Sequence, residues 1–434
     1  MDTLQAGAAT KDISPKNSQF LFGYPHVPRY STGVHDPLFS SALYVSDRGT
    51  QVMFIANDII FVPREVALRA RQRIEEATGI PGGNIMITAT HTHSGPKTLD
   101  YLSNEDDPMV PKTDPVYVSL LEAGIVEAAV TAHGHARPAE VGLAIADGSG
   151  VGTNRRDASG PSDPEVPVLM VRSEGKPIAC MVVCSMHPTV LHQDTTLISG
   201  DFPAMARRFL QQELLGDDCP VLHHTGPAGN QSPRHVIHGH TFAEAERIGA
   251  MLGEAIARVI PGIEYLPKTP LEARRAFVDL PPRTFPSIAQ AAHRLARAAQ
   301  RLAQLQASGA PWQEIRSAEV DWFGAEETLT LAKAATAGRL EEVYRACLPA
   351  EIQAIRVGPW WFIGWPGEIF VEYALAVKAR QPRTFIISLA NGELQGYIAT
   401  EDADKFGGYE ASNAIFAPQS GKILVDTTLE LLSH

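Results

Sequence analysis

The sequence predicts an α/β protein in which layered β-sheets are flanked by helices. Two stretches repeat one order of elements: a hairpin of two apolar strands, an amphipathic helix, and a further strand ending in histidine and a Gly-Pro turn. We interpret them as two ββαβ-like halves, and paired units of this kind give sheets covered by helices. Residues 287–348 have the character of a helical hairpin inserted into this framework.

The first half spans residues 42–96. Its predicted strands are ALYVSD and GTQVMFIAND, its helix is REVALRARQRIEEATG, and its last strand is the apolar run that ends in ATHTHSGP. His91 and His93 therefore stand at the open end of a buried sheet, at positions i and i+2, which point to the same face of an extended chain. Strand ends of this kind commonly hold a metal ion or a reacting carbonyl.

The second half spans residues 166–229 and follows the same plan. VPVLMVRSEG and PIACMVVCSMHP form its hairpin, FPAMARRFLQQELLG its helix, and CPVLHHTGPAG its last strand. His187 ends a long apolar strand just before a proline. Asp201 precedes the helix, where it caps the first turn or accepts a hydrogen bond from a ligand histidine; the capping role is the better supported.

The rest of the chain holds the insert and a return to strands. Trp312, Trp322 and Phe323 in the insert line a substrate pocket or fix the insert to the core, and both interpretations stay open. After the insert, EIQAIRVGPWWFIGW predicts a strand hairpin, PGEIFVEYALAVKAR a helix and TFIISLANGELQGYIAT a strand. Because no low-complexity linker interrupts the chain, we expect residues 1–434 to form one domain.

Composition excludes several classes of function. The 434 residues carry 37 basic and 49 acidic side chains, a net charge of −12, without a basic stripe, so nucleic acid is not an expected partner. No signal-peptide core or transmembrane run is visible, and we expect a cytoplasmic protein. Four cysteines make no disulfide framework, and the pair at 180 and 184 lies in an apolar run typical of buried thiols.

The two strand-end histidines are candidate metal ligands. A catalytic zinc takes about three protein ligands and keeps a position for water. Taken alone, His91 or His187 is more often a strand-end histidine hydrogen-bonded to the backbone. Their equivalent positions in the two halves favour the metal site, because both can project from the same edge of the layered core.

Four other segments carry polar residues with more than one explanation. Glu368 stands in the first turn of a predicted helix, where the helix dipole favours a carboxylate in any case. Tyr397 and Tyr409 flank a polar loop and are compatible with ordinary packing. Ser232 lies in the turn GPAGNQSPRH, and three interpretations stay open for it: a nucleophile, a hydrogen-bond donor to the substrate, or a plain turn residue. Arg155, in VGTNRRD, holds an anion or is solvated.

In their order along the chain, these segments resemble the catalytic domain of the neutral, non-lysosomal ceramidase family. The matching pieces are AGAATKDISP, FGYP, GVHDPLFSSAL, TATHTHSGP, TNRR, MHPTVL with ISGDFP, PAGNQSP, WPGE and the two tyrosines. They span nearly the whole chain, and HTHSGP with the paired tyrosines is specific to the family. We expect the family's C-terminal β-sandwich domain to be missing from this chain.

The resemblance implies a role for each matched position. It implies His91, His187, Glu368 and Tyr397 as zinc ligands. It implies that His93, Arg155 and Tyr409 contact the reacting amide and its leaving group, with His93 moving a proton. Ser232 matches a serine treated in the family as catalytic, and a zinc-activated water is an equally good attacker.

The function expected from this resemblance is zinc-dependent hydrolysis of an amide, in a small-molecule or lipid-like N-acyl substrate, and hence a role in lipid metabolism. The serine turn has Pro227 and Asn230 where the family usually has asparagine and aspartate, so an amide other than ceramide is a candidate substrate. Two alternatives stay open: an ester or lactone hydrolase with the same metal, and a binding protein on the same scaffold that has lost catalysis.

Overall fold

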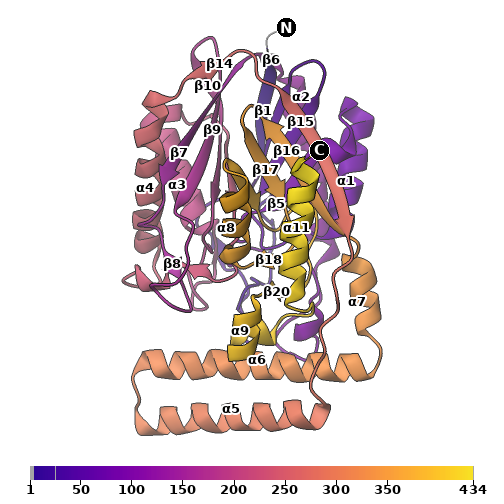
Figure 1. Ribbon diagram of the computed structural model, residues 1–434. Helices are drawn as coiled ribbons and strands as arrows, with labels where there is room; N and C mark the ends of the chain where they lie inside the picture. Colours follow the sequence, from indigo (N-terminus) through magenta and orange to yellow (C-terminus); the bar gives the residue numbers. More distant parts are fainter. Residues whose placement is uncertain (1–3, 25, 434) are drawn as a thin grey trace.

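The computed structural model describes residues 4–24 and 26–433, without the side chains of residues 312 and 313. Three sheets form its body, and paired helices cover the outer face of each (Figure 1). The mixed, layered α/β architecture predicted from the sequence is confirmed, as are the two repeated halves. The structure adds a third unit with the same order of strands, which the sequence analysis did not recognise as a repeat.

The first unit holds a five-stranded sheet of order β5-β4-β3-β1-β6. Strands β1, β3 and β4 are antiparallel neighbours, and β5 returns parallel to β4 after a crossover helix. A second helix then covers the sheet beside the first. The elements are β1 (Gln5–Asp12), β3 (Phe39–Ser46), β4 (Gln51–Asn57), α1 (Arg64–Thr78), β5 (Ile85–Ala89), α2 (Pro115–Gly134) and β6 (Arg137–Pro138).

The second unit repeats this arrangement in a sheet of order β12-β10-β9-β7-β14. Strands β7, β9 and β10 are antiparallel neighbours, and β12 is parallel to β10. Each half therefore begins with one strand more than the sequence analysis assigned to it. The elements are β7 (Glu140–Asp147), β9 (Glu165–Ser173), β10 (Lys176–Cys184), α3 (Asp201–Leu210), β12 (Val221–Thr225), α4 (Phe242–Val259) and β14 (Tyr265–Leu266).

The third unit has a four-stranded sheet of order β15-β16-β17-β19, again with three antiparallel strands followed by a parallel one. The helical insert separates its first two strands, and this interruption conceals the repeat in the sequence. The elements are β15 (Leu271–Val278), β16 (Ala350–Val357), β17 (Trp360–Gly364), α8 (Val371–Arg380), β19 (Thr384–Ile387) and α11 (Gln419–Ser433).

The inner faces of the three sheets share one apolar core, and alternation along the strands decides which side chains enter it. In β4, Phe54 faces this central core while its neighbours Met53 and Ile55 face α1 and α2. The strands of the other units alternate in the same way. Central-core residues from the three sheets include Leu43, Val45, Phe54, Leu169, Met181, Leu222, Ile355, Phe362 and Phe385.

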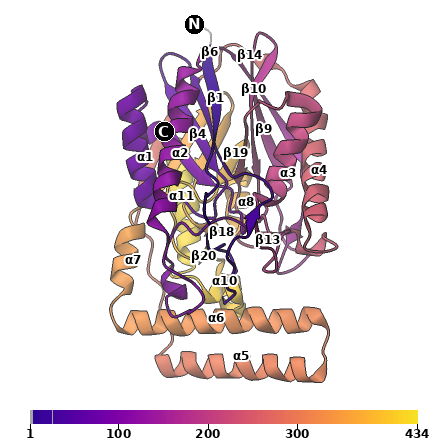
Figure 2. The same cartoon turned by 180° about the vertical axis from the view of Figure 1, so that it is seen from behind.

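The insert consists of α5 (Ile288–Ser308), α6 (Trp312–Thr336) and the short α7 (Leu340–Cys347). Helices α5 and α6 run antiparallel across one end of the body, roughly perpendicular to the strands (Figures 1 and 2). Helix α6 lies against the body, where it meets the short helix α10, and α7 packs on the core of the third unit. The predicted helical hairpin is therefore present, and it closes the end of the molecule at which the parallel strands terminate.

Short elements connect the three units near this end. They are β2 (Gly33–Val34), β8 (Thr153–Asn154), β11 (Leu197–Ile198), β13 (Gln231–Ser232), β18 (Glu368–Ile369), β20 (Tyr397–Ile398), α9 (Glu401–Phe406) and α10 (Tyr409–Ser412), with single turns of 3-10 helix at 102–104 and 233–235. Further turns of 3-10 helix at 82–84 and 260–262 and of π-helix at 211–215 precede β5, β14 and β12.

Within the described residues, α2 alone is long and apolar enough to cross a membrane by length and composition. One such helix is weak evidence for a membrane span, because core helices pass the same test. Its buried face, which includes Leu121, Ile125 and Ala129, packs against the first sheet and against α1. We therefore assign α2 to the core. All four cysteines are buried and free, and the prediction of buried thiols at Cys180 and Cys184 is confirmed.

Candidate metal centre and active site

Three side chains from three different units meet where the parallel strands end. His91 follows β5 of the first unit, His187 follows β10 of the second, and Glu368 follows β17 of the third. All three are buried. The carboxyl ends of such strands are where α/β proteins commonly place their ligands, and here one residue comes from each sheet.

The donor atoms of these residues face one another at short range. The Nε2 atoms of His91 and His187 are 3.2 Å apart, and Glu368 Oε2 lies 3.3 Å from the first and 3.1 Å from the second. Tetrahedral zinc with bonds of about 2.0–2.1 Å separates its ligand atoms by about 3.3 Å. The observed separations therefore fit a zinc ion between the three atoms.

Backbone carbonyls fix the orientation of both rings. His91 Nδ1 donates to the carbonyl oxygen of Ile60 at 2.9 Å, and His187 Nδ1 donates to those of Ala228 and Gln231. With Nδ1 protonated, each neutral ring turns an Nε2 lone pair towards Glu368. Burial lowers the pKa of His187 to about 4. Two facing lone pairs beside a carboxylate make a donor set suited to a cation.

The backbone at His91 supports the same interpretation. Its φ of 67° lies in the left-handed region, which non-glycine residues rarely adopt. The His91 N–H bonds to the Ile59 carbonyl at 2.9 Å, which holds this conformation in place. Backbone strain of this kind concentrates at functional sites, where the surrounding structure maintains it.

His93 adds a third imidazole to the cluster. Its Nε2 lies 3.4 Å from that of His91, and donor atoms of His91, His93 and His187 all fall within 4.8 Å of one another. Burial, followed by the other two histidines, lowers the pKa of His93 well below its usual range. Its Nδ1 is buried and has no hydrogen-bond partner within the described part of the chain, so the ring is free to exchange a proton there.

Gly23 allows the chain to approach His93, a feature the sequence analysis missed. Its φ is +123°, and a Cβ at this position would lie 2.6 Å from Cγ of the His93 ring. A residue other than glycine would therefore displace the histidine. The Tyr24 ring packs edge-on against the same imidazole, with 5.2 Å between ring centroids.

Tyr397 lies beside Glu368 because β18 and β20 pair as short parallel strands, with these two residues in register. The Arg155 guanidinium carbon lies 5.3 Å from the centroid of the Tyr397 ring. The centroids of the Tyr397 and Tyr409 rings are 6.0 Å apart. Burial, followed by the charge of Glu368, raises the pKa of Tyr397 well above its usual range. Four of the predicted site residues thus share one environment.

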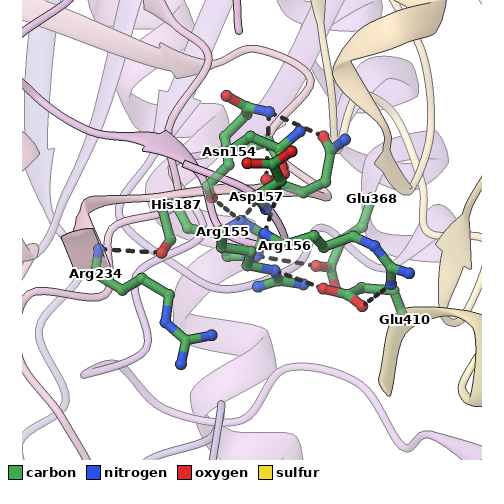
Figure 3. Close-up of polar contacts among 12 residues, drawn as sticks. Asn154, Arg155, Arg156, Asp157, His187, Arg234, Glu368 and Glu410 are labelled. Atoms are coloured by element: carbon green, nitrogen blue, oxygen red, sulfur yellow. Dashed lines mark hydrogen bonds and ion pairs between the residues drawn. The ribbon is translucent and has the colours of Figure 1, made fainter. Parts of the chain in front are cut away.

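A buried carboxylate holds Arg155 in place. Glu410 accepts from Arg155 Nε and from Arg156 Nη1, each at 2.8 Å (Figure 3). The Arg155 Nη2 atom is buried and has no partner among the described residues, so it has N–H groups to offer a ligand. Arg156 differs, because its Nη2 donates to the Gly407 carbonyl at 2.9 Å. Glu410 is a further residue that the sequence analysis did not identify.

A small pocket, with a cavity volume of about 40 Å³, connects these groups. Aromatic side chains form much of its wall, and polar groups lie on the metal side and on the side covered by the insert. It is lined by Phe22, Gly23, Ile60, Phe61, His91, His93, Tyr101, Asn104, Glu368, Tyr397, Tyr409 and Asn413. Burial raises the pKa of Tyr409 well above its usual range, with Glu327 of the insert the next contributor.

The Ser232 hydroxyl caps a short turn in the PAGNQSP loop. It accepts from the Arg234 N–H at 3.2 Å, at the start of the 3-10 turn at 233–235. Ser232 is not among the residues that line the pocket, whereas its neighbour Gln231 contacts His187 through its carbonyl oxygen. The described contacts therefore make the PAGNQSP loop a support for the His187 ring.

Asp201 has neither of the roles that the sequence suggested. Gly200 occupies the cap position of α3, and Asp201 is the first helical residue, with φ of 57°. Its carboxylate accepts from the N–H groups of Leu191 and Phe202 at 2.9 and 2.6 Å. Burial raises its pKa to about 7. Asp201 thus anchors the loop that follows His187 and does not bond to the imidazole.

The aromatic residues of the insert fix it to the body. The rings of Trp322 and Phe323 pack against His26, with centroids at 5.3 and 4.8 Å, and neither lines the pocket. This favours the packing interpretation of these two residues over the pocket interpretation. The Trp312 side chain lies outside the part of the chain that the structure describes.

Comparison with known proteins identifies relatives of this chain. Residues 4–223 match the model of the family described as "Neutral/alkaline non-lysosomal ceramidase, N-terminal". "Neutral ceramidase B" of Dictyostelium discoideum is 22% identical over 231 residues, covering 49% of this chain and 32% of that protein. "Neutral ceramidase" of Oryza sativa subsp. japonica is 26% identical over 252 residues, covering 50% and 32%. The matches thus span about a third of these relatives' own length.

Two solved structures share the fold over nearly the whole chain. The neutral ceramidase from Pseudomonas aeruginosa superposes with a TM-score of 0.78 at 19% identity, covering 99% of this chain and 74% of that one. A ceramidase complexed with C2 gives a TM-score of 0.76 at 17% identity, covering 99% and 75%. Because the family model covers half of the sequence and this fold covers the remainder, the chain belongs to the neutral/alkaline non-lysosomal ceramidase family.

Proposed function

We propose that this protein is a zinc-dependent hydrolase of the amide bond in an N-acyl compound. The observation that supports this most strongly is the meeting of the His91 and His187 Nε2 atoms with Glu368 Oε2, at separations of 3.1–3.3 Å. Membership of the ceramidase family supports amide hydrolysis. Tyr397, beside Glu368, is the proposed additional ligand.

When bound, zinc would polarise the substrate carbonyl and lower the pKa of a water to about 7, which makes it an attacking nucleophile at neutral pH. The protein supplies the remaining groups. The free N–H of Arg155 Nη2 and the Tyr409 hydroxyl are the proposed donors to the oxygen that becomes negatively charged. His93, whose ring is neutral and whose Nδ1 has no described partner, is the proposed carrier of a proton to the leaving amine.

The structure favours water over Ser232 as the attacking group. The serine hydroxyl is engaged as a cap, and the residue is absent from the pocket lining. His93, by contrast, lines the pocket and lies at hydrogen-bonding distance from a ligand nitrogen. We therefore propose that Ser232 supports the loop under His187.

The first experiment compares an amide with the ester of the same acyl group, N-dodecanoyl ethylamine and ethyl dodecanoate. We expect the zinc-loaded protein to release ethylamine, to stop after chelation, and to recover when zinc is restored. Hydrolysis of the ester alone would assign the site to an esterase. A zinc-loaded protein that cleaves neither compound would contradict the proposed activity and favour a binding role.

Arg155→Met should lower kcat roughly 100-fold, the usual effect of losing one oxyanion donor, while zinc content stays unchanged. The matched control is Arg156→Met, which removes an ion pair to the same Glu410 but no unpaired donor. Its loss should be much smaller. Equal losses in the two variants would mean that the ion pair to Glu410, and not the free N–H, is what turnover requires.

Ser232→Ala should keep zinc and most of its turnover, and should lose about 1 kcal/mol of unfolding free energy with the cap. Urea denaturation, metal analysis and steady-state kinetics on one preparation measure all three. Complete loss of turnover in a folded, zinc-loaded variant would instead identify Ser232 as the nucleophile.

A further inference from the structure

The insert helix α6 packs one face directly onto the segment that carries Tyr409. Gly324, Glu327 and Thr328 lie at positions i, i+3 and i+4, so they share that face. A Cβ on Gly324 would lie 3.1 Å from the Ser412 Cβ and 3.4 Å from the Tyr409 Cα. Thr328 Oγ1 donates to the Gly324 carbonyl of its own helix at 2.7 Å and lies 3.3 Å from the Ser412 carbonyl oxygen. The insert therefore forms part of the support of the pocket.

Glu327 connects this face to the pocket wall. Its side chain is 1% exposed, and its carboxyl group accepts from Asn104 Nδ2 at 3.0 Å and from Asn413 Nδ2. Both asparagines line the pocket. They come from distant parts of the chain, one from the 3-10 turn between β5 and α2 and one from the residue that follows α10. One carboxyl group of the insert thus holds two amide groups side by side.

Away from the metal side, the rest of the pocket wall is mostly apolar, so the two asparagine amides are the groups there that can recognise a polar part of the substrate. Phe22, Phe61 and Tyr101 form an aromatic wall that offers little hydrogen bonding, and Tyr101 directs its hydroxyl to Glu393 at 2.8 Å. The cavity volume of about 40 Å³ is far below the usual range for ligand sites, about 300–1,000 Å³. A group enclosed here must be short.

The wall is also close to neutral. Burial raises the pKa of Glu327 to about 8, while the two asparagines act in the opposite direction. The amides carry no charge. A neutral wall of amide and carboxyl groups suits a partner that is polar but uncharged, and a hydroxyl, which both donates and accepts, matches either orientation of the amides.

We propose that Glu327, Asn104 and Asn413 form a polar end wall that selects an amide whose enclosed part is short and ends in a hydroxyl. This inference rests on the proposed amide hydrolysis and specifies its substrate class. Glu327 acts through the two asparagines and is a positioning residue; Asn104 and Asn413 are the residues that contact the substrate. The insert thereby contributes to specificity as well as to the shape of the molecule.

Two pairs of equally sized amides test this inference. N-dodecanoyl ethanolamine and N-dodecanoyl propylamine differ by a hydroxyl against a methyl on the amine side. The amides of dodecylamine with 3-hydroxypropanoic acid and with butanoic acid make the same comparison on the acyl side. In one of the pairs, kcat/KM should be at least about 10-fold higher for the hydroxyl compound, because the methyl leaves buried amides without a partner.

Asn413→Leu, Asn104→Leu and Glu327→Leu should each reduce this ratio towards one, and Glu327→Gln should retain part of it. Lys333→Gln, which removes an exposed ion pair to Asp106 on the same helix, is the control and should keep the full ratio. Because both compounds are measured on one protein sample, the ratio does not depend on the folded fraction of a variant.

The possible failures are distinguishable. Hydrolysis of all four amides with ratios near one in the wild type would overturn the end wall and leave the amide hydrolase intact. A ratio that persists in the three leucine variants would also overturn the end wall. Failure of the zinc-loaded wild type to cleave any amide would overturn the proposed function, and this inference with it.

Discussion

The close approach of two imidazole lone pairs and a carboxylate is the interaction on which the rest of the site depends. The Nε2 atoms of His91 and His187 are 3.2 Å apart, a distance at which two lone pairs repel unless a cation or a shared proton lies between them. Glu368 Oε2, at 3.3 and 3.1 Å from these two atoms, adds a carboxylate oxygen to the same small space. The remaining features of the site serve to maintain this arrangement.

Hydrogen bonds to backbone groups hold the two imidazole rings in this arrangement. Carbonyl oxygens of Ile60, Ala228 and Gln231 orient the rings, and the left-handed conformation of His91 is fixed by its bond to Ile59. Since each of the three residues follows a strand of a different sheet, the geometry of the site depends on how the three sheets pack around their common core. Disturbing that core at any sheet would move one of them.

Some of this arrangement was accessible from the sequence, and the reasons differ by residue. His91 and His187 occupy equivalent strand ends in two recognisable repeats, so local patterns sufficed to select them. The third repeat was hidden because 71 residues, which contain the helical insert, separate the end of β15 at Val278 from the start of β16 at Ala350. Glu368 was therefore ambiguous on local grounds, and only the resemblance to a family singled it out.

Other features depend on long-range contacts that no local pattern carries. Glu410 pairs with Arg155 across 255 positions, and Glu327 bonds to Asn104 across 223. In the sequence both glutamates have the appearance of ordinary helix-surface residues, although both are buried. The predicted capping role of Asp201 was wrong for a related reason. The Asp201 carboxylate bonds to the N–H of Leu191 in the loop that follows His187, and Gly200 occupies the cap position.

The most direct test of the account is to locate zinc by anomalous diffraction at the zinc edge, in crystals of the zinc-loaded protein. The account predicts one ion per chain, bonded to Nε2 of His91 and of His187 and to a Glu368 oxygen at about 2.0–2.2 Å. Zinc bound elsewhere, or a site that stays empty with the two histidines in place, would contradict it.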